Sequence, residues 1–232
     1  MTDKCVCLLS GGMDSATVAT LASKKGYECY ALSFDYGQRH KKELKSASEI
    51  AQRLNIQHKI VMINLEDIAY SALTGHGEVD KRNIDSIRSE IPNTYVPSRN
   101  IMFLSIAASY AESIGAREIF IGANAIDYSG YPDCRPEFYN KFEIALNTGT
   151  KAGNFRIRVP LQYLSKRDIV KLATKIGAPL ELTTSCYEGS DLACGHCDSC
   201  QLRLRGFMEA GIKDPIRYNS YPDFYKKWLE NI

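Results

Sequence analysis

The chain has 232 residues, of which 24% are charged and 44% hydrophobic, and its 29 basic and 27 acidic side chains leave a net charge of +2. This length accommodates one large α/β domain with a small appendage, and a nearly balanced charge argues against non-specific nucleic-acid binding. No apolar run approaches the ~18 residues of a membrane span, and no leader precedes the first strand-like run. We therefore expect a cytoplasmic protein with neither membrane nor nucleic acid among its partners.

The first predicted strand, 5–9, ends in the small-residue stretch SGGMDS at 10–15 and leads into a helix at 16–24. A glycine loop between strand and helix presents backbone N–H groups and the positive end of the helix dipole to one anion. The loop lacks the lysine of GxxxxGK[ST] and carries Asp14 and Ser15 near that place. Because a carboxylate beside phosphates requires a bridging cation, the loop predicts an ATP–Mg²⁺ site that holds the pyrophosphate end.

Five strand-like runs alternate with helix-like segments along the chain. After the first, they lie at 27–35, 58–63, 118–121 and 156–159. Such alternation predicts a doubly wound, mostly parallel five-stranded sheet with helices on both faces, which binds ligands at the carboxyl ends of its strands. The segments that leave those ends are expected to converge on one cleft: 10–15, 35–40, 122–135 and 160–166.

Capping residues set the ends of several predicted helices. Asn100 is the expected N-cap of a helix ended by Gly115, and Ser165 begins a helix closed by Gly177. Pro136 fits the first turn of a helix that reaches about residue 146. The loop at 122–135, before Pro136, is long and rich in glycine, aspartate and tyrosine. A long loop of this kind is typical of a functional segment.

The region between the third strand and Asn100 has a weaker pattern. Before it, apolar residues recur at helical spacing over 44–54 and predict a clear helix. We expect a short helix at 65–73 and a mobile loop or lid over 75–90.

Four cysteines near the C-terminus form the spacing C-x₇-C-x₂-C-x₂-C: Cys186, Cys194, Cys197 and Cys200. Four thiolates can surround one tetrahedral ion and leave no open position, which predicts a structural Zn²⁺. An iron–sulfur cluster is the alternative, but no Cys-Pro follows the last cysteine. His196 could replace one ligand, although a histidine between cysteines usually lies outside the shell. We therefore divide the chain into an ATP-binding part, 1–182, and a zinc-binding segment with a C-terminal helix packed on the same domain, 183–232.

The other four cysteines carry weaker signals. Cys5, Cys7 and Cys29 lie in strand-like runs and are expected to be buried as small hydrophobic residues. Cys134 lies in a predicted cleft loop, where a reactive thiol is an alternative to a buried one.

Five segments spread over nearly the whole chain share the features of one family. They are SGGMDS at 10–15, FDYGQRH at 34–40, VPSRNIMFLSIA at 96–107, GANAIDYSGYPDCRPEF at 122–138 and the terminal SCY…CGHCDSCQLR. Together they resemble the 7-cyano-7-deazaguanine synthases of queuosine biosynthesis, members of the PP-loop ATP pyrophosphatase superfamily. The resemblance implies an adenine nucleotide alpha hydrolase-like fold and an ATP-dependent carbon–nitrogen ligase. Its substrates would be 7-carboxy-7-deazaguanine and ammonia, which give an amide and then a nitrile.

The resemblance also implies roles for particular residues. Asp14, Ser15 and Lys166 would be catalytic, with Asp14 orienting Mg²⁺ and Lys166 binding phosphate. ATP would contact Leu8, Leu9, Ser10, Gly11, Gly12, Met13, Asp14, Ser15, Ala16, Thr17 and Val18. Arg99 and Arg135 are candidate clamps for the substrate carboxylate. For the other substrate contacts we expect Asp127 or Asp133 at the base edge, Tyr128 or Tyr131 at its ring, and Gln38, Arg39 and His40 on the ammonia side.

Two rival functions stay open from the sequence. A PP-loop tRNA thiolase would need a catalytic cysteine pair and a tRNA-binding extension, and a zinc-dependent nucleic-acid module has slight support from Arg203 and Arg205. Ammonia would be free or supplied by a partner, because no glutaminase region is present. The aromatic C-terminal run 218–228 is expected to dock on its own domain or to form the contact of a homodimer, which is the expected assembly.

Overall fold

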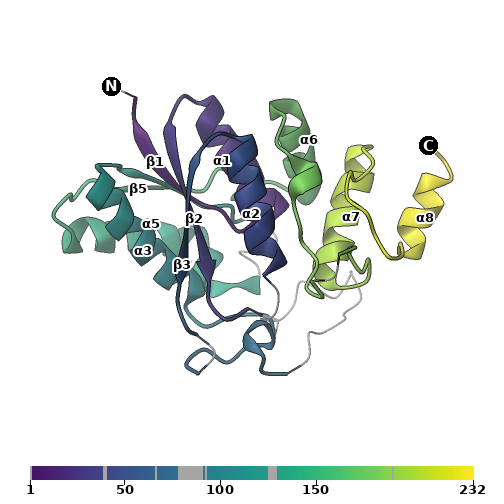
Figure 1. Cartoon of the computed structure of the whole chain (residues 1–232), viewed down its shortest axis with the longest axis horizontal. Helices are drawn as coiled ribbons and strands as arrows, with labels where there is room; N and C mark the ends of the chain where they lie inside the picture. Colours follow the sequence, from purple (N-terminus) through teal and green to yellow (C-terminus); the bar gives the residue numbers. More distant parts are fainter. Residues whose placement is uncertain are drawn as a thin grey trace.

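A parallel sheet of five strands forms the centre of the molecule, in the order β3-β2-β1-β4-β5 (Figure 1). The computed structural model describes residues 2–38, 41–65, 67–77, 91, 93–124, 130–189 and 191–232. All four strand pairings are parallel. The predicted sheet is confirmed, and each strand lies within a residue of its expected position: β1 Lys4–Leu8, β2 Glu28–Asp35, β3 Gln57–Met62, β4 Glu118–Phe120 and β5 Arg156–Arg158.

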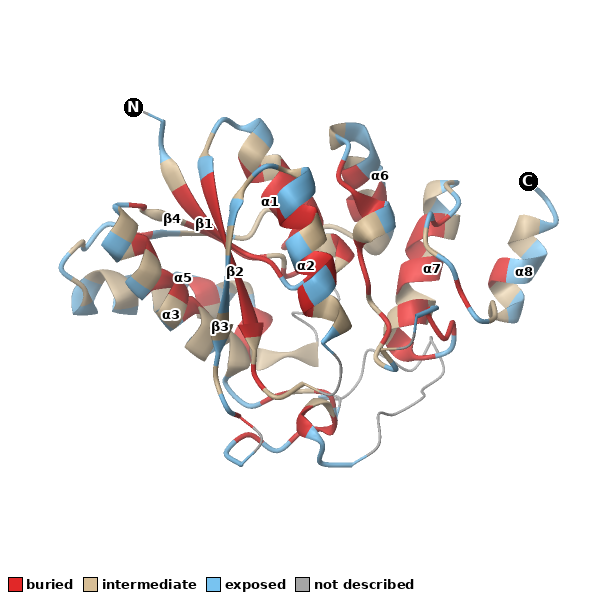
Figure 2. Ribbon diagram, in the orientation of Figure 1, coloured by how far each residue is buried: buried red, intermediate tan, exposed pale blue. Residues whose placement is uncertain are grey.

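Helices cover both faces of the sheet (Figure 1). In β1, Cys5 and Cys7 belong to one hydrophobic core, whereas Val6 and Leu8 belong to a second core on the opposite face. Successive side chains of a strand point to opposite faces, so a strand buried on both reads as a continuous apolar run. The first core receives α1 Met13–Lys24, α2 Lys42–Arg53 and α6 Lys166–Ile176, and the second receives α3 Arg99–Ile114 and α5 Pro136–Gly149. Figure 2 shows the buried central strands beside the more exposed edge strand β3.

Some predicted helix ends are confirmed and others are corrected: α1 begins at Met13 rather than at 16, and α5 ends at Gly149 rather than near 146. Ser165 caps α6 by accepting the backbone N–H of Asp168, and α6 ends at the left-handed Gly177. The prediction that Asn100 caps α3 is wrong, because the helix begins one residue earlier, at Arg99. The backbone N–H of Asn100 instead donates to Asp133 Oδ2 at 3.0 Å. The capping group comes from a distant loop, which local sequence cannot indicate.

The segment after β3 forms a tight turn. We expected a helix at 65–73, but the described residues of this segment hold only turns and the single 3₁₀ turn η1, Ala72–Thr74. Ser71 accepts the N–H of Leu73, and Thr74 accepts the N–H of Ser71, so local side-chain bonds replace the helical ladder. Of the expected loop or lid at 75–90, residues 75–77 form a turn after η1, and 78–90 lie outside the described residues. None of the described helices is long and apolar enough to cross a membrane.

The C-terminal part adds η4 Leu180–Leu182, α7 Asp198–Ala210 and α8 Asp223–Leu229. α7 and α8 lie beyond α6 (Figure 1). α7 packs closely on α6: a Cβ added at Gly206 would lie 2.8 Å from the Cβ of Lys166. The four terminal cysteines and the aromatic residues form a third core, in which Tyr225 is fully buried. The aromatic run therefore docks on its own domain, one of the two alternatives that the sequence leaves open.

A buried ion pair joins α7 to the segment before α8. Arg203 Nε lies 2.7 Å from Asp214 Oδ2, and both residues are at most 4% exposed. We expect Asp214→Ala to lower the free energy of unfolding by about 3–5 kcal/mol, because an unpaired guanidinium would remain in the interior. Urea denaturation measures the loss. As control, Glu49→Ala removes an exposed i,i+4 pair with Lys45 and should cost no more than about 1 kcal/mol. Equal losses in the two variants would contradict this account.

Candidate active site

A cavity of about 340 Å³ opens at the carboxyl ends of the strands. Each of the four segments expected at the cleft contributes described residues to its lining, among them Ser10, Gln38, Gly122 and Lys166. The predicted convergence is therefore confirmed for the part of the chain that the structure describes. The cavity also includes the start of α3 and residues of the cysteine segment, which the strand pattern alone does not bring there.

The loop after β1 is shaped to receive an anion. Gly11 adopts φ +85°, and a Cβ there would lie 2.2 Å from the carbonyl oxygen of Glu43, so only glycine fits. The Ser15 hydroxyl closes the loop by accepting the N–H of Ser10 and donating to the carbonyl of Gly12. Gly12 is the N-cap of α1 and supplies no side-chain cap. The first N–H groups of α1 are thus available to phosphate oxygens.

Asp14 connects three elements at the floor of the cavity. Its Oδ2 accepts from Lys166 Nζ at 2.5 Å and from Asn124 Nδ2 at 2.8 Å. Its Oδ1 is buried, and no described residue donates a hydrogen bond to it. A buried carboxylate oxygen without a donor is a fitting ligand for a hard cation such as Mg²⁺.

Arg99, at the start of α3, brings a positive charge to the same cavity. Its Nη1 lies 3.5 Å from Tyr36 Oη, and its guanidinium carbon lies 6.0 Å from the Tyr36 ring centroid. Burial opposes the charge, but the neighbouring Tyr36 and Tyr131 more than offset it and raise the pKa of Arg99. Within the described ranges no carboxylate forms an ion pair with Arg99. The cavity therefore contains a charged guanidinium that an anionic substrate can pair with.

The remaining substrate candidates are placed differently from one another. Tyr131 and Gln38 line the cavity, although the Gln38 amide is taken up by bonds to Tyr36 N and Phe34 O within its own turn. Asp133 and Arg135 are absent from the lining: Asp133 is buried and caps α3, and Arg135 is exposed. The other four predicted contacts lie outside the described residues: Arg39, His40, Asp127 and Tyr128.

Three lining or supporting residues escaped the sequence interpretation. Asn124 follows the end of β4 within the noted motif, so its place in the chain gave a signal that could have been used. Tyr36 also lies in a noted motif, directly after β2, and lines the cavity. Glu43 looks like an ordinary acidic residue in the first turn of α2, and nothing in its local sequence distinguishes it.

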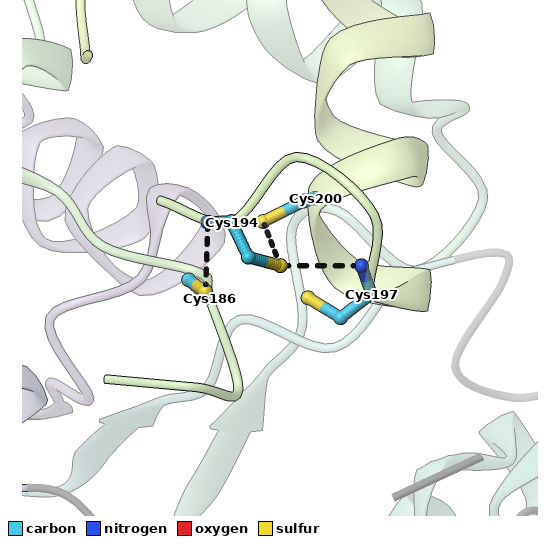
Figure 3. Close-up of side chains that lie close together, drawn as sticks. All are labelled: Cys186, Cys194, Cys197 and Cys200. Carbon is cyan, nitrogen blue, oxygen red and sulfur yellow. Dashed lines mark hydrogen bonds between the residues drawn. The ribbon is translucent and has the colours of Figure 1, made fainter. Parts of the chain in front are cut away.

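The four terminal cysteines form one cluster that could hold a metal ion (Figure 3). All four are buried, and their sulfurs lie within 4.8 Å of one another. Cys194 N donates to Cys186 Sγ and Cys197 N to Cys194 Sγ, each at 3.3 Å. Hydrogen bonds from Cys197 and Cys200 lower the pKa of the Cys186 thiol, and the same contacts raise the pKa values of Cys197 and Cys200. Four cysteine sulfurs would fill all four positions of a tetrahedral ion, as in a structural metal site.

His196 lies outside this sulfur set. Its Nε2 is 2.5 Å from Ser220 Oγ, and the metal-ligand cluster contains cysteine sulfurs alone. These contacts agree with the expectation that the histidine is not a ligand.

The cysteine cluster supports the cavity directly. Thr184 N donates to the carbonyl of Gly11 at 2.9 Å, which joins the segment before the first ligand to the phosphate loop. Cys186 itself lines the cavity. Because Gly206 packs against Lys166, α7 also backs the lysine that contacts Asp14. The cysteine segment and α7 thus fix the positions of the Gly11 loop and of Lys166 in the cavity.

The other cysteines are buried as expected. Cys5, Cys7 and Cys29 place their sulfurs within 4.8 Å of one another inside the first core. Cys134 lines the cavity, where its Sγ accepts from Asn100 Nδ2 at 3.1 Å. This contact joins the thiol to the first turn of α3.

Comparison with known proteins identifies the family. The model of the queuosine biosynthesis protein QueC family matches residues 4–211. The chain belongs to the QueC family. Its relatives include the 7-cyano-7-deazaguanine synthase of Thermoplasma volcanium, 62% identical over 100% of this chain and 98% of that protein. The synthase of the same name from Pseudomonas syringae pv. syringae is 54% identical over 93% of this chain and 96% of that protein.

Solved structures outside the QueC family share the fold. The NMN synthetase of Francisella tularensis matches with a TM-score of 0.51 and 18% identity, over 99% of this chain and 84% of that one. The U34-tRNA thiolase NcsA of Methanococcus maripaludis, with its [4Fe-4S] cluster, matches with a TM-score of 0.51 and 15% identity, over 100% of this chain and 74% of that one. These similarities confirm the expected α/β fold.

Proposed function

We propose that this chain is an ATP-dependent carbon–nitrogen ligase that converts 7-carboxy-7-deazaguanine and ammonia into 7-cyano-7-deazaguanine. Membership of the QueC family and the names of its relatives support this reaction. The structural observation that supports this reaction most directly is that the groups needed for it line one cavity. A phosphate loop with Asp14 and Lys166 lies in the same cavity as Arg99, a guanidinium with no carboxylate partner among the described residues.

The first half-reaction activates the substrate carboxylate. Arg99 would hold that carboxylate so that one of its oxygens attacks the α-phosphorus of ATP. The N–H groups of the loop and Lys166 would stabilise the departing pyrophosphate. Ammonia would then add to the acyl carbon of the adenylate, and AMP would leave with the amide as product.

The second half-reaction would use the same groups. The amide oxygen would attack the α-phosphorus of a second ATP, and loss of AMP and of the N–H protons would produce the nitrile. Positioning and charge stabilisation account for these steps without a protein nucleophile. Tyr131 lines the cavity and is proposed as a contact for the deazaguanine ring.

Two metals belong to the proposal. The four terminal cysteines would hold a structural Zn²⁺, and Asp14 with the ATP phosphates would hold Mg²⁺. Mg²⁺ supplies positive charge that neutralises the developing charge on pyrophosphate. We further infer a cytoplasmic homodimer with a catalytic part at 1–182 and the cysteine segment at 183–232, using ammonia that is free or delivered by a partner.

Mass analysis of the products tests the reaction. After incubation with ATP, Mg²⁺, ammonia and 7-carboxy-7-deazaguanine, we expect the amide first and then the nitrile.

Arg99→Ala should lose at least ~10²-fold in kcat/KM for the acid, because it removes a desolvated charge pair with the substrate. Arg135→Ala is the matched control, since Arg135 is exposed and absent from the cavity lining. If the wild-type protein forms neither the amide nor the nitrile, the proposed function is rejected.

A further inference from the structure

Glu43 lies beside the phosphate loop, in the first turn of α2. Its carbonyl oxygen occupies the space that a Cβ of Gly11 would need, so the backbone of Glu43 packs directly against the loop. The residue lines the cavity and is half-buried. Glu43 is therefore next to the loop proposed to hold the ATP phosphates, and its carboxyl has no role in the steps above.

The Glu43 carboxyl is not neutralised by a neighbour. No described residue donates a hydrogen bond to it or forms an ion pair with it, and Arg99 acts on it only at longer range. Burial raises the pKa of Glu43 to about 7, and Arg99 offsets part of this rise. The charged side chains of the cavity wall have their own contacts: Arg99 with Tyr36, Lys166 with Asp14, Arg203 with Asp214, and Lys42, the neighbour of Glu43 on α2, with the carbonyl of Asp191. The other ionisable side chains that line it are Tyr131, Cys134, Cys186 and Tyr187.

This position suits a cation rather than a second anion. An ionised carboxyl in a cavity repels other carboxylates and attracts small cations, and ammonium is the cationic reactant of the proposed reaction. Ammonium has no lone pair, so it must lose a proton before it can attack carbon. A carboxyl that titrates near the working pH is an efficient acceptor for that proton.

We propose that Glu43 binds ammonium in the cavity and accepts a proton from it, so that ammonia attacks the adenylated substrate. This inference rests on the proposed function. One N–H bond of ammonium breaks and its proton goes to a Glu43 carboxylate oxygen. The nitrogen lone pair forms the C–N bond, the adduct loses a second proton to water, and the C–O bond to AMP breaks. No oxidant or reductant is involved.

Glu43→Gln tests the role, with Glu49→Gln as the matched control on the exposed part of α2. Both variants should keep the thermal stability and acid-dependent ATP–pyrophosphate exchange of the wild type, within about twofold. At neutral pH we expect Glu43→Gln to lose ~10²-fold or more in the rate of amide formation from ammonium. The deficit should shrink as the pH rises, because more of the ammonia is then unprotonated.

Hydroxylamine supplies the decisive comparison. It is largely unprotonated at neutral pH, so it should form the hydroxamate with Glu43→Gln nearly as fast as with wild type. In the wild type, amide formation should rise with pH as Glu43 ionises through its pKa of about 7. Loss of exchange, an equal deficit with hydroxylamine, or a deficit that is independent of pH would overturn the inference, and each would indicate a role in binding or folding. A wild-type protein that forms no amide would instead reject the proposed function.

Discussion

Asp14→Ala should abolish acid-dependent ATP–pyrophosphate exchange, with a loss of roughly 10³-fold or more. The substitution removes the buried Oδ1 proposed as the Mg²⁺ ligand. It also leaves Lys166 Nζ without the carboxylate that lies 2.5 Å away. Both changes affect the groups that would stabilise pyrophosphate as it leaves, so the chemical step should fail even where ATP still binds. Exchange of labelled pyrophosphate into ATP measures the effect.

Asp14→Asn separates charge from shape. The amide keeps the size of the side chain but supplies no negative oxygen to a cation, so we expect almost the same loss as for alanine. Metal content at the cysteine cluster should match the wild type in both variants, because the four sulfurs do not contact Asp14. Retained exchange in either variant would remove Asp14 from the proposed Mg²⁺ site.

Cys200→Ser should abolish binding of the proposed structural metal and, with it, the activity. Binding of a structural zinc contributes about 10–16 kcal/mol in zinc-finger peptides, comparable with the whole stability of a typical domain. Loss of the metal should loosen the segment that contacts the phosphate loop through Thr184 and the helix that backs Lys166 through Gly206. Exchange should therefore fall although no cysteine carries out chemistry. Elemental analysis and the exchange assay together measure the effect.

Cys5→Ala is the control for the cysteine prediction. Cys5 is buried in the first core, away from the terminal cluster, so this variant should keep one metal ion per chain. The wild-type metal should be zinc without visible absorbance, whereas an iron–sulfur cluster would colour the protein. A Cys200→Ser protein that has lost its metal and still exchanges pyrophosphate at the wild-type rate would refute the supporting role of the cluster.

The features that could be predicted are those set by residues close together in the sequence. Strands buried on both faces read as apolar runs, and the loop between β1 and α1 has a composition that marks an anion site. Lys166 was placed with this loop although it lies far along the chain, because both follow the carboxyl ends of strands, and its contact with Asp14 agrees with that prediction.

Other features depend on tertiary contacts that have no local signal. Asp133 was one of two aspartates expected at the base edge, but its carboxylate accepts the N–H of Asn100 in the first turn of α3. Arg135 follows closely in the same loop and is exposed, because neighbouring residues can point in opposite directions. Glu43 has the sequence of a solvent-facing first turn, and only the packing of α2 on Gly11 brings it to the cavity.

Isotope transfer from the substrate to the nucleotide tests the central claim most directly. The acid is prepared with heavy oxygen in its carboxylate and incubated with the protein, ATP, Mg²⁺ and ammonia, and the nucleotide products are analysed by mass spectrometry. If the carboxylate and then the amide attack the α-phosphorus, the heavy oxygen will appear in AMP and none will appear in inorganic phosphate. Label in inorganic phosphate together with ADP, or unlabelled AMP, would contradict the account.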